Sequence, residues 1–296
     1  MLVGFAFDFL LTGAQQKHCV VMLATLAVLI NGAVPPIERA ALVEFFDATT
    51  GSKWGNGSSW LQGDPCDDRW FGIFCNSEKT HVTEVFPNPR WSGNTLRGTI
   101  PTSLFQLSEL QHLYLSNDRP PGWSELSGSL PTEIGRLSSL KCLYTSHAGK
   151  LTGTLPSEIS GLTRLQGLYS RWTKFQGALP DLSRLTNLSK IIIDSSPIHH
   201  CPPLCSNAFS GTLAALASWN LPLAHLDVAD NDFSGPFPTE LCKIDKCTAF
   251  GNHFTTKRPK GCCDGLTADE ADDESSLTQG NECHPHDFPG AGLRVW

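Results

Sequence analysis

The sequence predicts an α/β solenoid, because two patterns recur along most of its length. In the first pattern, Leu or Phe precedes Gly by two residues, and an apolar residue, usually followed by Pro, comes two residues after the Gly. The copies are centred on Gly98, Gly128, Gly153, Gly177, Gly211 and Gly235, at intervals of 30, 25, 24, 34 and 24 residues. A repeat of about 24 residues is typical of coils that stack and share an apolar core. Such a fold presents a long open surface, which favours a binding function.

The second pattern lies between these glycines, where Leu or Ile recurs every third residue and then every second residue. The first full copy consists of Leu104, Leu107, Leu110, Leu113 and Leu115. A spacing of three indicates a short α- or 3₁₀-helical stretch, and a spacing of two indicates a strand. Each coil is therefore predicted to hold one strand and one short helical segment.

Together these patterns resemble the leucine-rich repeat, L-x-x-L-x-L-x-x-N-x-L, in which strands line a horseshoe. The L-x-G-x-[IL]-P phrase resembles the plant-type subclass found in receptor-kinase ectodomains, receptor-like proteins and polygalacturonase-inhibiting proteins. Residues 60–66 and 70–75 are similar to the N-terminal cap of that family, W…PC…W-x-G-[VI]-x-C. The resemblance covers about residues 37–254. It implies a horseshoe with a parallel concave β-sheet, a second short strand in each coil and disulfide-bonded terminal caps.

This organisation divides the chain into four parts. Residues 1–33 are expected to be a signal peptide or anchor, 34–81 the N-terminal cap, 82–254 about seven repeats, and 255–296 a C-terminal cap with an acidic tail. The apolar run 20–30 has the length of a signal-peptide core and is too short to span a bilayer, and Ala33 is the expected cleavage site. We predict a secreted protein, or a membrane-attached one if this run is retained.

Two further elements are expected near the N-terminus. Residues 35–49 are predicted to form a helix that covers the first coil, with Trp54, Trp60 and Trp70 in the core of the cap. A first strand is expected at 85–88. The net charge is −7 without a basic cluster, which argues against nucleic-acid binding.

The chain has eleven cysteines, and removal of a leader containing Cys19 would leave ten, an even number that suits a secreted, oxidised protein. We expect Cys66 to pair with Cys75, and Cys201 and Cys205 to close a small loop. Cys142 has no assigned partner. The C-terminal cap contains further cysteines whose pairing is left open: Cys242, Cys247, Cys262, Cys263 and Cys283. Asn56 and Asn187 begin N-x-S sequons and are predicted glycosylation sites.

Alternation along each strand should place Leu in the core and the intervening residues on the concave face. Aligned strands then give three columns. The middle column is Phe86, Tyr114, Tyr144, Tyr169, Ile192, Asp227 and Thr248. The preceding column is Glu84, His112, Cys142, Gly167, Lys190, His225 and Lys246. The following column is Asn88, Ser116, Ser146, Arg171, Asp194, Ala229 and Phe250. All three tyrosines of the chain are thus consecutive in one column.

We predict a ligand-binding site on this face. Its candidate residues are Tyr114, Tyr144, Tyr169, His112, Arg171, Trp172, Asp194, His225 and Asp227. Tyrosine offers a rigid apolar plane and a hydroxyl group, which suits protein interfaces and sugar stacking. The alternative is that these aromatic rings stabilise the sheet by packing on one another across strands. The two interpretations do not exclude each other.

Other motifs give weaker predictions. His199, His200, Cys201 and Cys205 have zinc-ligand chemistry, but their cramped spacing favours a disulfide loop with exposed histidines. Insertions at 118–125 and 195–208 are expected to form loops on one face, and Trp123 in the first is a candidate surface contact. No motif of an enzyme is present, and we expect no metal and no cofactor.

The resulting functional hypothesis is a secreted or cell-surface recognition protein that binds a protein, peptide or glycan on its concave face. The resemblance to polygalacturonase-inhibiting proteins implies an alternative, inhibition of a secreted cell-wall hydrolase. A third possibility is a structural subunit of an extracellular or larger assembly, which would use its edges and insertions.

Overall fold

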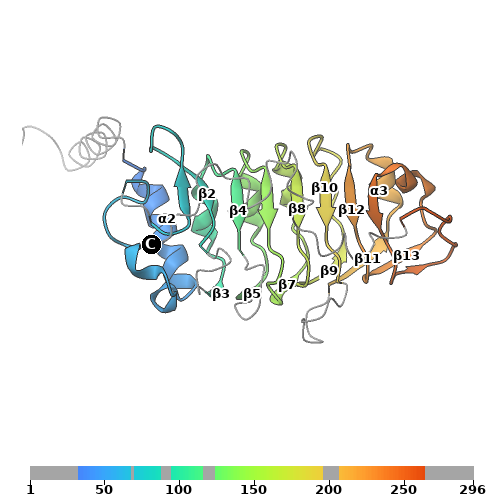
Figure 1. The fold of residues 1–296 in the computed structure, drawn as a ribbon, viewed down its shortest axis with the longest axis horizontal. Coiled ribbons are helices and arrows are strands. Elements are labelled where there is room, and N and C mark those ends of the chain that lie inside the picture. Colours follow the sequence, from blue (N-terminus) through green and yellow to red (C-terminus); the bar gives the residue numbers. More distant parts are fainter. Residues whose placement is uncertain (1–32, 68–69, 88–94, 116–123, 196–206, 264–296) are drawn as a thin grey trace, which may run out of the picture.

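The computed structural model describes residues 33–67, 70–87, 95–115, 124–195 and 207–263. These residues form a solenoid whose long axis runs across Figure 1, with the strands of one sheet standing side by side along it. In order across this first sheet, the strands are β1 (Ile73–Cys75), β2 (Val82–Val85), β4 (His112–Tyr114), β6 (Cys142–Tyr144), β8 (Gly167–Tyr169), β10 (Lys190–Ile192), β12 (His225–Asp227) and β14 (Lys246–Thr248). All neighbours are parallel except β1 and β2, which form an antiparallel hairpin.

A second sheet runs along the lower edge of the view in Figure 1 and is also parallel. Its strands are β3 (Arg97–Thr99), β5 (Glu125–Gly128), β7 (Lys150–Gly153), β9 (Lys174–Ala178), β11 (Ala208–Thr212), β13 (Asp232–Gly235) and β15 (His253–Phe254). The six repeated Gly phrases supply the strands β3 to β13, as the resemblance implied.

The helical segment predicted for every coil is wrong for the coil after β9, where residues 179–189 contain turns and no helix. Short helices follow β3, β5, β7, β11 and β13, and three further helices lie in the N-terminal cap. They are α2 (Pro36–Ala48), η1 (Gly51–Lys53), η2 (Gly57–Ser59), η3 (Thr102–Gln106), η4 (Thr132–Arg136), η5 (Ser157–Gly161), α3 (Ala214–Ser218) and η6 (Thr239–Lys243). Helix α2 lies at the blue end of Figure 1 and packs against η3, which confirms the predicted covering helix. None of the helices in the described ranges is long and apolar enough to cross a bilayer.

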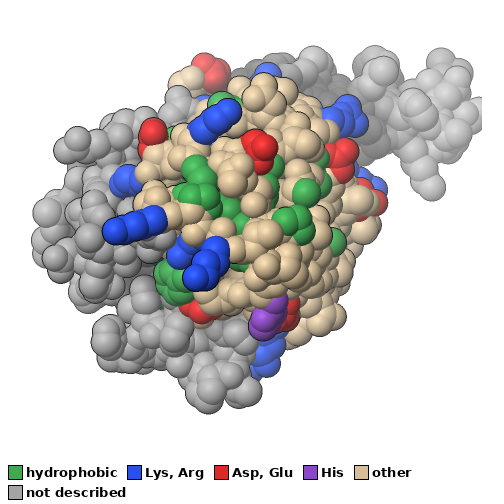
Figure 2. Space-filling model, turned by 90° about the vertical axis from the view of Figure 1, so that its right-hand side faces the viewer, with side chains coloured by type: hydrophobic (Ala, Val, Ile, Leu, Met, Phe, Trp, Pro, Cys, Tyr) green, Lys and Arg blue, Asp and Glu red, His purple; other side chains and the backbone are tan. Residues whose placement is uncertain are grey.

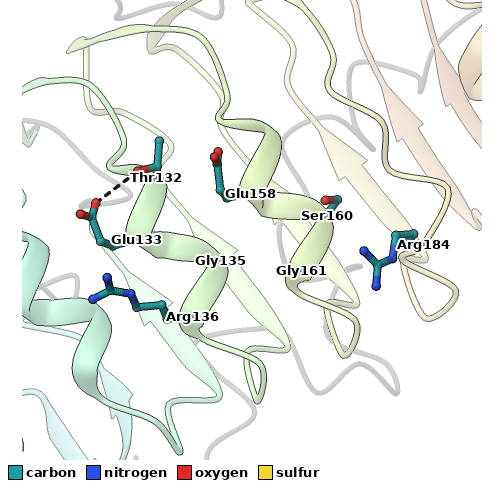
Figure 3. Close-up of a pocket in the computed structure, with 8 residues that line it drawn as sticks. All are labelled: Thr132, Glu133, Gly135, Arg136, Glu158, Ser160, Gly161 and Arg184. Carbon is teal, nitrogen blue, oxygen red and sulfur yellow. Dashed lines mark hydrogen bonds between the residues drawn. The ribbon is translucent and has the colours of Figure 1, made fainter.

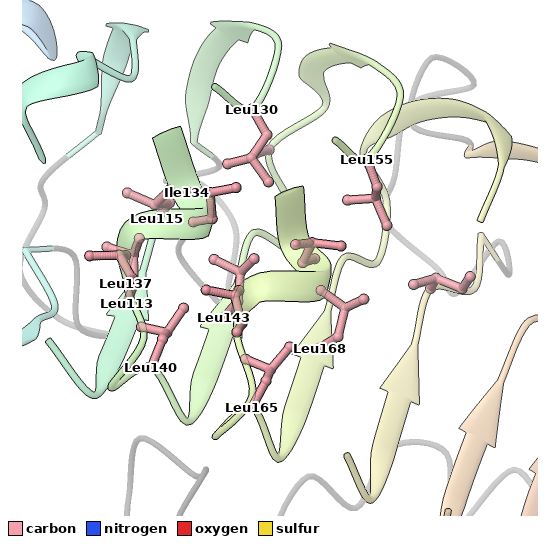
Figure 4. Close-up of a cluster of buried hydrophobic side chains, with 14 of the residues drawn as sticks. Leu113, Leu115, Leu130, Ile134, Leu137, Leu140, Leu143, Leu155, Leu165 and Leu168 are labelled. Atoms are coloured by element: carbon pink, nitrogen blue, oxygen red, sulfur yellow. The ribbon is translucent and has the colours of Figure 1, made fainter. Parts of the chain in front are cut away.

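The repeated Leu and Ile side chains form one continuous core. Leu113, Leu143 and Leu168 occupy the same place in successive strands and are fully buried, as are Ile134 and Leu140 on the helical side. Figure 4 shows these side chains stacked from coil to coil between the strands and the short helices. The alternation read from the sequence is thereby confirmed.

The repeated glycines have a conformational and a steric role. Gly177 and Gly235 both have φ of +79°, a region that disfavours residues with a Cβ atom. A Cβ atom on Gly177 would lie 3.1 Å from Cγ2 of Thr154, and one on Gly235 would lie 3.0 Å from Cγ2 of Thr212. In each case, the residue after one repeat glycine packs over the glycine of the next coil. The phrase therefore sets the distance between coils.

Buried asparagine side chains bond the turns after the concave strands. Asn231 donates from Nδ2 to the carbonyls of Ile193 (3.0 Å) and Ala229 (3.0 Å), and its Oδ1 accepts the amide of Phe209 (3.1 Å). In the preceding coil Asn207 has this role, since its Nδ2 donates to Ser170 O at 2.7 Å and its Oδ1 accepts the amide of Phe175 at 3.2 Å. Asn207 was not predicted in this role, because the insertion before it hides its place in the repeat.

The N-terminal cap has an aromatic core, as predicted. Trp54, Trp60 and Trp70 are buried, with ring centroids 5.2 Å apart for both Trp54–Trp60 and Trp60–Trp70. The Cys66–Cys75 disulfide is present. The predicted strand at 85–88 is wrong in its bounds, since β2 covers Val82–Val85. It begins earlier because the hairpin with β1 pairs Cys75 with Val82.

The C-terminal cap contains two disulfides, whose pairing the sequence left open. They are Cys242–Cys262 and Cys247–Cys263. Cys142 is disulfide-bonded as well. The predicted Cys201–Cys205 loop, Cys283 and the residues 1–32 lie outside the described residues, as does the tail 264–296.

Candidate functional site

The concave columns have the predicted register. Parallel pairing places His112 opposite Cys142, Cys142 opposite Gly167, and Gly167 opposite Lys190. His225 and Lys246 continue the same column, which is the one that precedes the tyrosines. The middle column is paired in the same way, in the order Tyr114, Tyr144, Tyr169, Ile192, Asp227 and Thr248. The strands thus bring the candidate residues onto one face of one sheet.

The rings of Phe86 and the three tyrosines pack on one another in order across the strands, and we call these four rings the aromatic ladder. Ring centroids are 4.9 Å apart for Phe86–Tyr114, 5.9 Å for Tyr114–Tyr144 and 5.4 Å for Tyr144–Tyr169. The three tyrosine side chains are only 1%, 9% and 6% exposed. Burial raises the pKa of Tyr169, which keeps its hydroxyl group protonated. Packing between the rings, the alternative considered above, is therefore observed.

Gly167 makes room for the last ring of the ladder. A Cβ atom at this position would lie 2.5 Å from Cε2 of Tyr169. Because Gly167 has no side chain, the ring of Tyr169 can lie over the neighbouring column. This role of Gly167 was not predicted, because the repeat pattern assigns the residue only a place in the column.

Next to the ladder, Arg171 joins two carboxylates into a charged cluster. Its Nε lies 2.6 Å from Oδ1 of Asp194, and its Nη2 lies 3.3 Å from Oδ2 of Asp227. All three side chains are largely buried. Burial and the nearby Asp194 carboxylate raise the pKa of Asp227 to about 7. The sequence placed these residues on one face, and the structure shows them paired with one another.

His225 lies beside this cluster, in the row of the flanking lysines. It is paired in register with Lys190 on one side and Lys246 on the other. Burial, with the positive charges of Arg171 and these lysines, lowers the pKa of His225 to about 3. The imidazole ring is therefore neutral at physiological pH.

His112 lies at the β4 end of the predicted site, and Trp172 lies in the turn that follows β8. His112 Nδ1 lies 3.4 Å from Oε1 of Glu84. Trp172 has a left-handed backbone with φ of 48°, and its ring centroid lies 4.4 Å from that of His147. Burial and the charge of Arg171 lower the pKa of His147 to about 3. The His147–Trp172 stack was not foreseen, because both residues lie in turns.

Exposed aromatic side chains lie at the two ends of the concave face. Phe74 in β1 pairs in register with Glu84, so it extends the column of Glu84 and His112 by one strand. Its side chain is 41% exposed. Phe250 follows β14 at the other end and is 43% exposed. Phe74 was missed because the antiparallel β1 precedes the repeats and has no Leu spacing.

Several predicted residues remain untested by this geometry. Trp123, His199 and His200 lie outside the described residues. Asn187 is exposed and donates from Nδ2 to Thr163 O at 2.9 Å, while Asn56 is half-buried before η2. Over the described ranges, no group of three or more His, Cys, Asp and Glu side chains is placed to hold a metal ion.

A separate hollow of about 370 Å³ lies on the helical side, between η4 and η5. Figure 3 shows its lining residues, with Glu133 and Arg136 on η4, Glu158 on η5 and Arg184 beyond. The two helices approach closely at Gly135, where a Cβ atom would lie 2.7 Å from the carbonyl oxygen of Glu158. The hollow is polar and lies apart from the concave site.

Comparison with known proteins agrees with this architecture. No protein-family model matches the chain. The chain is 38% identical over 60 residues to a probable leucine-rich repeat receptor-like protein kinase of Arabidopsis thaliana, a match that covers 20% of this chain and 6% of that protein. The chain therefore spans a small part of that relative.

Solved structures give a longer match. The ectodomain of the Arabidopsis thaliana receptor kinase GASSHO1/SCHENGEN3, in complex with CASPARIAN STRIP INTEGRITY FACTOR 2, aligns with a TM-score of 0.58 and 23% identity, over 73% of this chain and 24% of that chain. The Arabidopsis thaliana BIR2 ectodomain aligns with a TM-score of 0.51 and 22% identity, over 77% of this chain and 97% of that chain. The chain has the leucine-rich-repeat fold of plant receptor ectodomains, as the sequence predicted.

Proposed function

We propose that this protein is a secreted or cell-surface recognition protein that binds a peptide or protein ligand on its concave sheet. The observation that carries the proposal is the continuity of that face, in which the aromatic ladder adjoins the cluster of Arg171, Asp194 and Asp227. Solenoid proteins use such extended surfaces for binding. A structural neighbour, the GASSHO1/SCHENGEN3 ectodomain, was solved with a bound factor.

An extracellular location is supported by the disulfides in both caps. Disulfides persist in oxidising compartments and are rare in the cytosol. The structural neighbours are ectodomains of membrane receptors. Together with the apolar run at 20–30, these features favour export of the chain.

The proposed ligand contacts two kinds of surface. The ladder supplies an apolar floor of packed rings, and its low exposure limits direct contact with a ligand. Phe74 and Phe250 supply exposed apolar area at either end. The role we propose is binding, in which Arg171 and the carboxylates of Asp194 and Asp227 supply the polar contacts beside the ladder.

The test is a pull-down with the full secreted chain against cell-surface protein and glycan fractions. One variant replaces Tyr114, Tyr144 and Tyr169 with Phe, which keeps the stack and removes the hydroxyl groups; a second replaces all three with Ala. A matched control replaces Thr152 and Gln176 on the second sheet with Ala. Circular dichroism checks that each variant is folded.

We expect the Ala variant to lose the bound partner, the Phe variant to retain part of the binding, and the control to match the wild type. A partner retained by a folded Ala variant would contradict the assignment and favour the structural-subunit interpretation. Binding of glycans alone would contradict the peptide or protein ligand.

A further inference from the structure

The C-terminal end of the solenoid exposes an apolar centre. Strands β14 and β15 are the last strands of their sheets, and among the described residues only the segment 255–263, tied back by the Cys242–Cys262 and Cys247–Cys263 disulfides, follows them. Phe254 packs edge-on against Phe237 at 5.2 Å, yet Phe254 and Ile244 remain only half-buried. Phe250, which follows β14 in the same coil, is exposed. Terminal repeats of solenoids require a polar covering to stay soluble.

Basic side chains surround this centre. Residues 239–263 contain five Lys and Arg residues against two Asp and Glu residues, a net charge of +3 in a chain whose total is −7. Lys243, Lys257 and Lys260 are exposed, and Lys246 is half-buried. Figure 2 views this end of the molecule and shows hydrophobic side chains near its middle, with Lys and Arg side chains beside them and Asp and Glu side chains also present on this face.

The chain itself supplies a segment of opposite charge. Residues 264–296 contain eight Asp and Glu residues and one Arg, a net charge of −7. This segment begins directly after Cys263, which is buried and tied to Cys247 of β14 by a disulfide. The acidic stretch is thus tethered to the basic end itself. Tethering by a short linker gives an effective concentration in the millimolar range.

We propose that the acidic segment 264–274 binds the basic, apolar end of the last coil and covers it. Attraction between the segment and Lys243, Lys246, Lys257 and Lys260 holds it there. A second copy of the chain fits this end less well, because end-to-end stacking would bring two faces of charge +3 together. Since the contact depends on exposed charges, it weakens with salt.

Zero-length carbodiimide cross-linking of the full chain tests this contact directly, because the reagent joins a lysine amine to a carboxylate that it touches. We expect cross-links from Asp269, Glu270 and Asp272 to Lys243 and Lys246 in the monomer, and their loss in 0.5 M salt. Lys53 and Lys174, which lie far from this end, serve as controls. Equal yields at Lys53 or Lys174 would overturn the proposal, and cross-links only between two chains would overturn it in favour of a second copy.

Hydrogen exchange provides a second measurement that needs no carboxylate. One variant neutralises the acidic segment by D269N, E270Q, D272N, D273N and E274Q. A matched control neutralises five exposed acidic residues elsewhere by E44Q, D47N, E78Q, E109Q and E158Q. We expect exchange in residues 243–254 to rise several-fold in the first variant only. Unchanged exchange in that variant would refute a covering segment.

Discussion

Asn231→Ala gives a quantitative test of the coil-to-coil bonding. The Asn231 side chain is 4% exposed and is bonded to four backbone groups in its own coil and the neighbouring ones. The carbonyls of Ile193, Val228 and Ala229 keep another donor in the variant, from Asn207, Asn252 and Ser195 respectively. Only the buried amide of Phe209 loses its side-chain acceptor.

The expected cost follows from that single group. A buried N–H without an acceptor costs about 1–3 kcal/mol, so we expect the free energy of unfolding to fall by about 2 kcal/mol. Urea unfolding of the full chain, followed by tryptophan fluorescence, measures the change. Hydrogen exchange at the amide of Phe209 reports the local loss of the bond and should become faster.

Asn252→Ala is the matched control. Asn252 makes equivalent bonds in the last coil, where its Oδ1 accepts the amide of Phe233 at 3.0 Å, but it is only half-buried. Water can replace its bonds there, so we expect a loss below about 1 kcal/mol. Equal losses in the two variants, or unchanged exchange at Phe209, would refute the reasoning that burial decides the cost.

Other predictions concern the cap, the pH response and the surface. Replacing Cys66 and Cys75 with Ser opens a loop of nine residues' separation and should lower stability by about 2–3 kcal/mol in thermal unfolding. The pKa of His225 is lowered to about 3, so between about pH 6.5 and 3 this residue is protonated in the unfolded chain but not in the folded one. The free energy of unfolding should therefore fall as the pH drops through that range, and His225→Gln should make this fall smaller. The pKa of Asp227 is raised to about 7, so its stabilising contribution to the folded state is present below about pH 4 and is lost as the pH rises to 7. Asp227→Asn should remove this fall in the free energy of unfolding, measured by urea titration. Glu125→Gln should change stability by less than about 1 kcal/mol, because its ion pairs with Arg97 and Lys150 are exposed; a larger loss would show that they matter structurally.

The repeats themselves were predictable, because the spacing of the Leu residues indicates both where each strand lies and which of its side chains face the core. Leu113 and Leu115 alternate with Tyr114, which fixes which side of β4 faces the core. The same counting in each coil then gives the register of the concave rows. The sheet edge was harder, since β1 belongs to an antiparallel hairpin before the repeats and Phe74 carries no repeat signature.

The repeat pattern could not predict which side chains on the concave face form ion pairs. Counting placed Arg171 and Asp194 in one column and Asp227 in the next, but the reach of Arg171 across two strands decides that it bridges both carboxylates. Asn207 did have a detectable signal. It precedes Phe209 by two residues, just as Asn231 precedes Phe233, and counting back from Phe rather than forward from the strand would have found it.

The two sheets of the solenoid are paired differently, and this difference determines how the molecule winds. In the first sheet equivalent residues face each other, as Tyr144 faces Tyr169. In the second, Gly177 faces Phe209, which lies two residues before the equivalent Gly211. From each coil to the next, the second sheet is therefore shifted along its strands by roughly 6.6 Å relative to the first sheet, which is the rise of two residues in a strand.

We infer that each coil turns about the long axis to accommodate this offset. The same offset recurs where Gly211 faces Phe233, so the rotation accumulates from one coil to the next. We expect Phe74 and Phe250, at the two ends of the concave face, to point in different directions as a result, so that a ligand touching both would follow a helical path. Removing one coil would change the angle between the two caps as well as the distance between them.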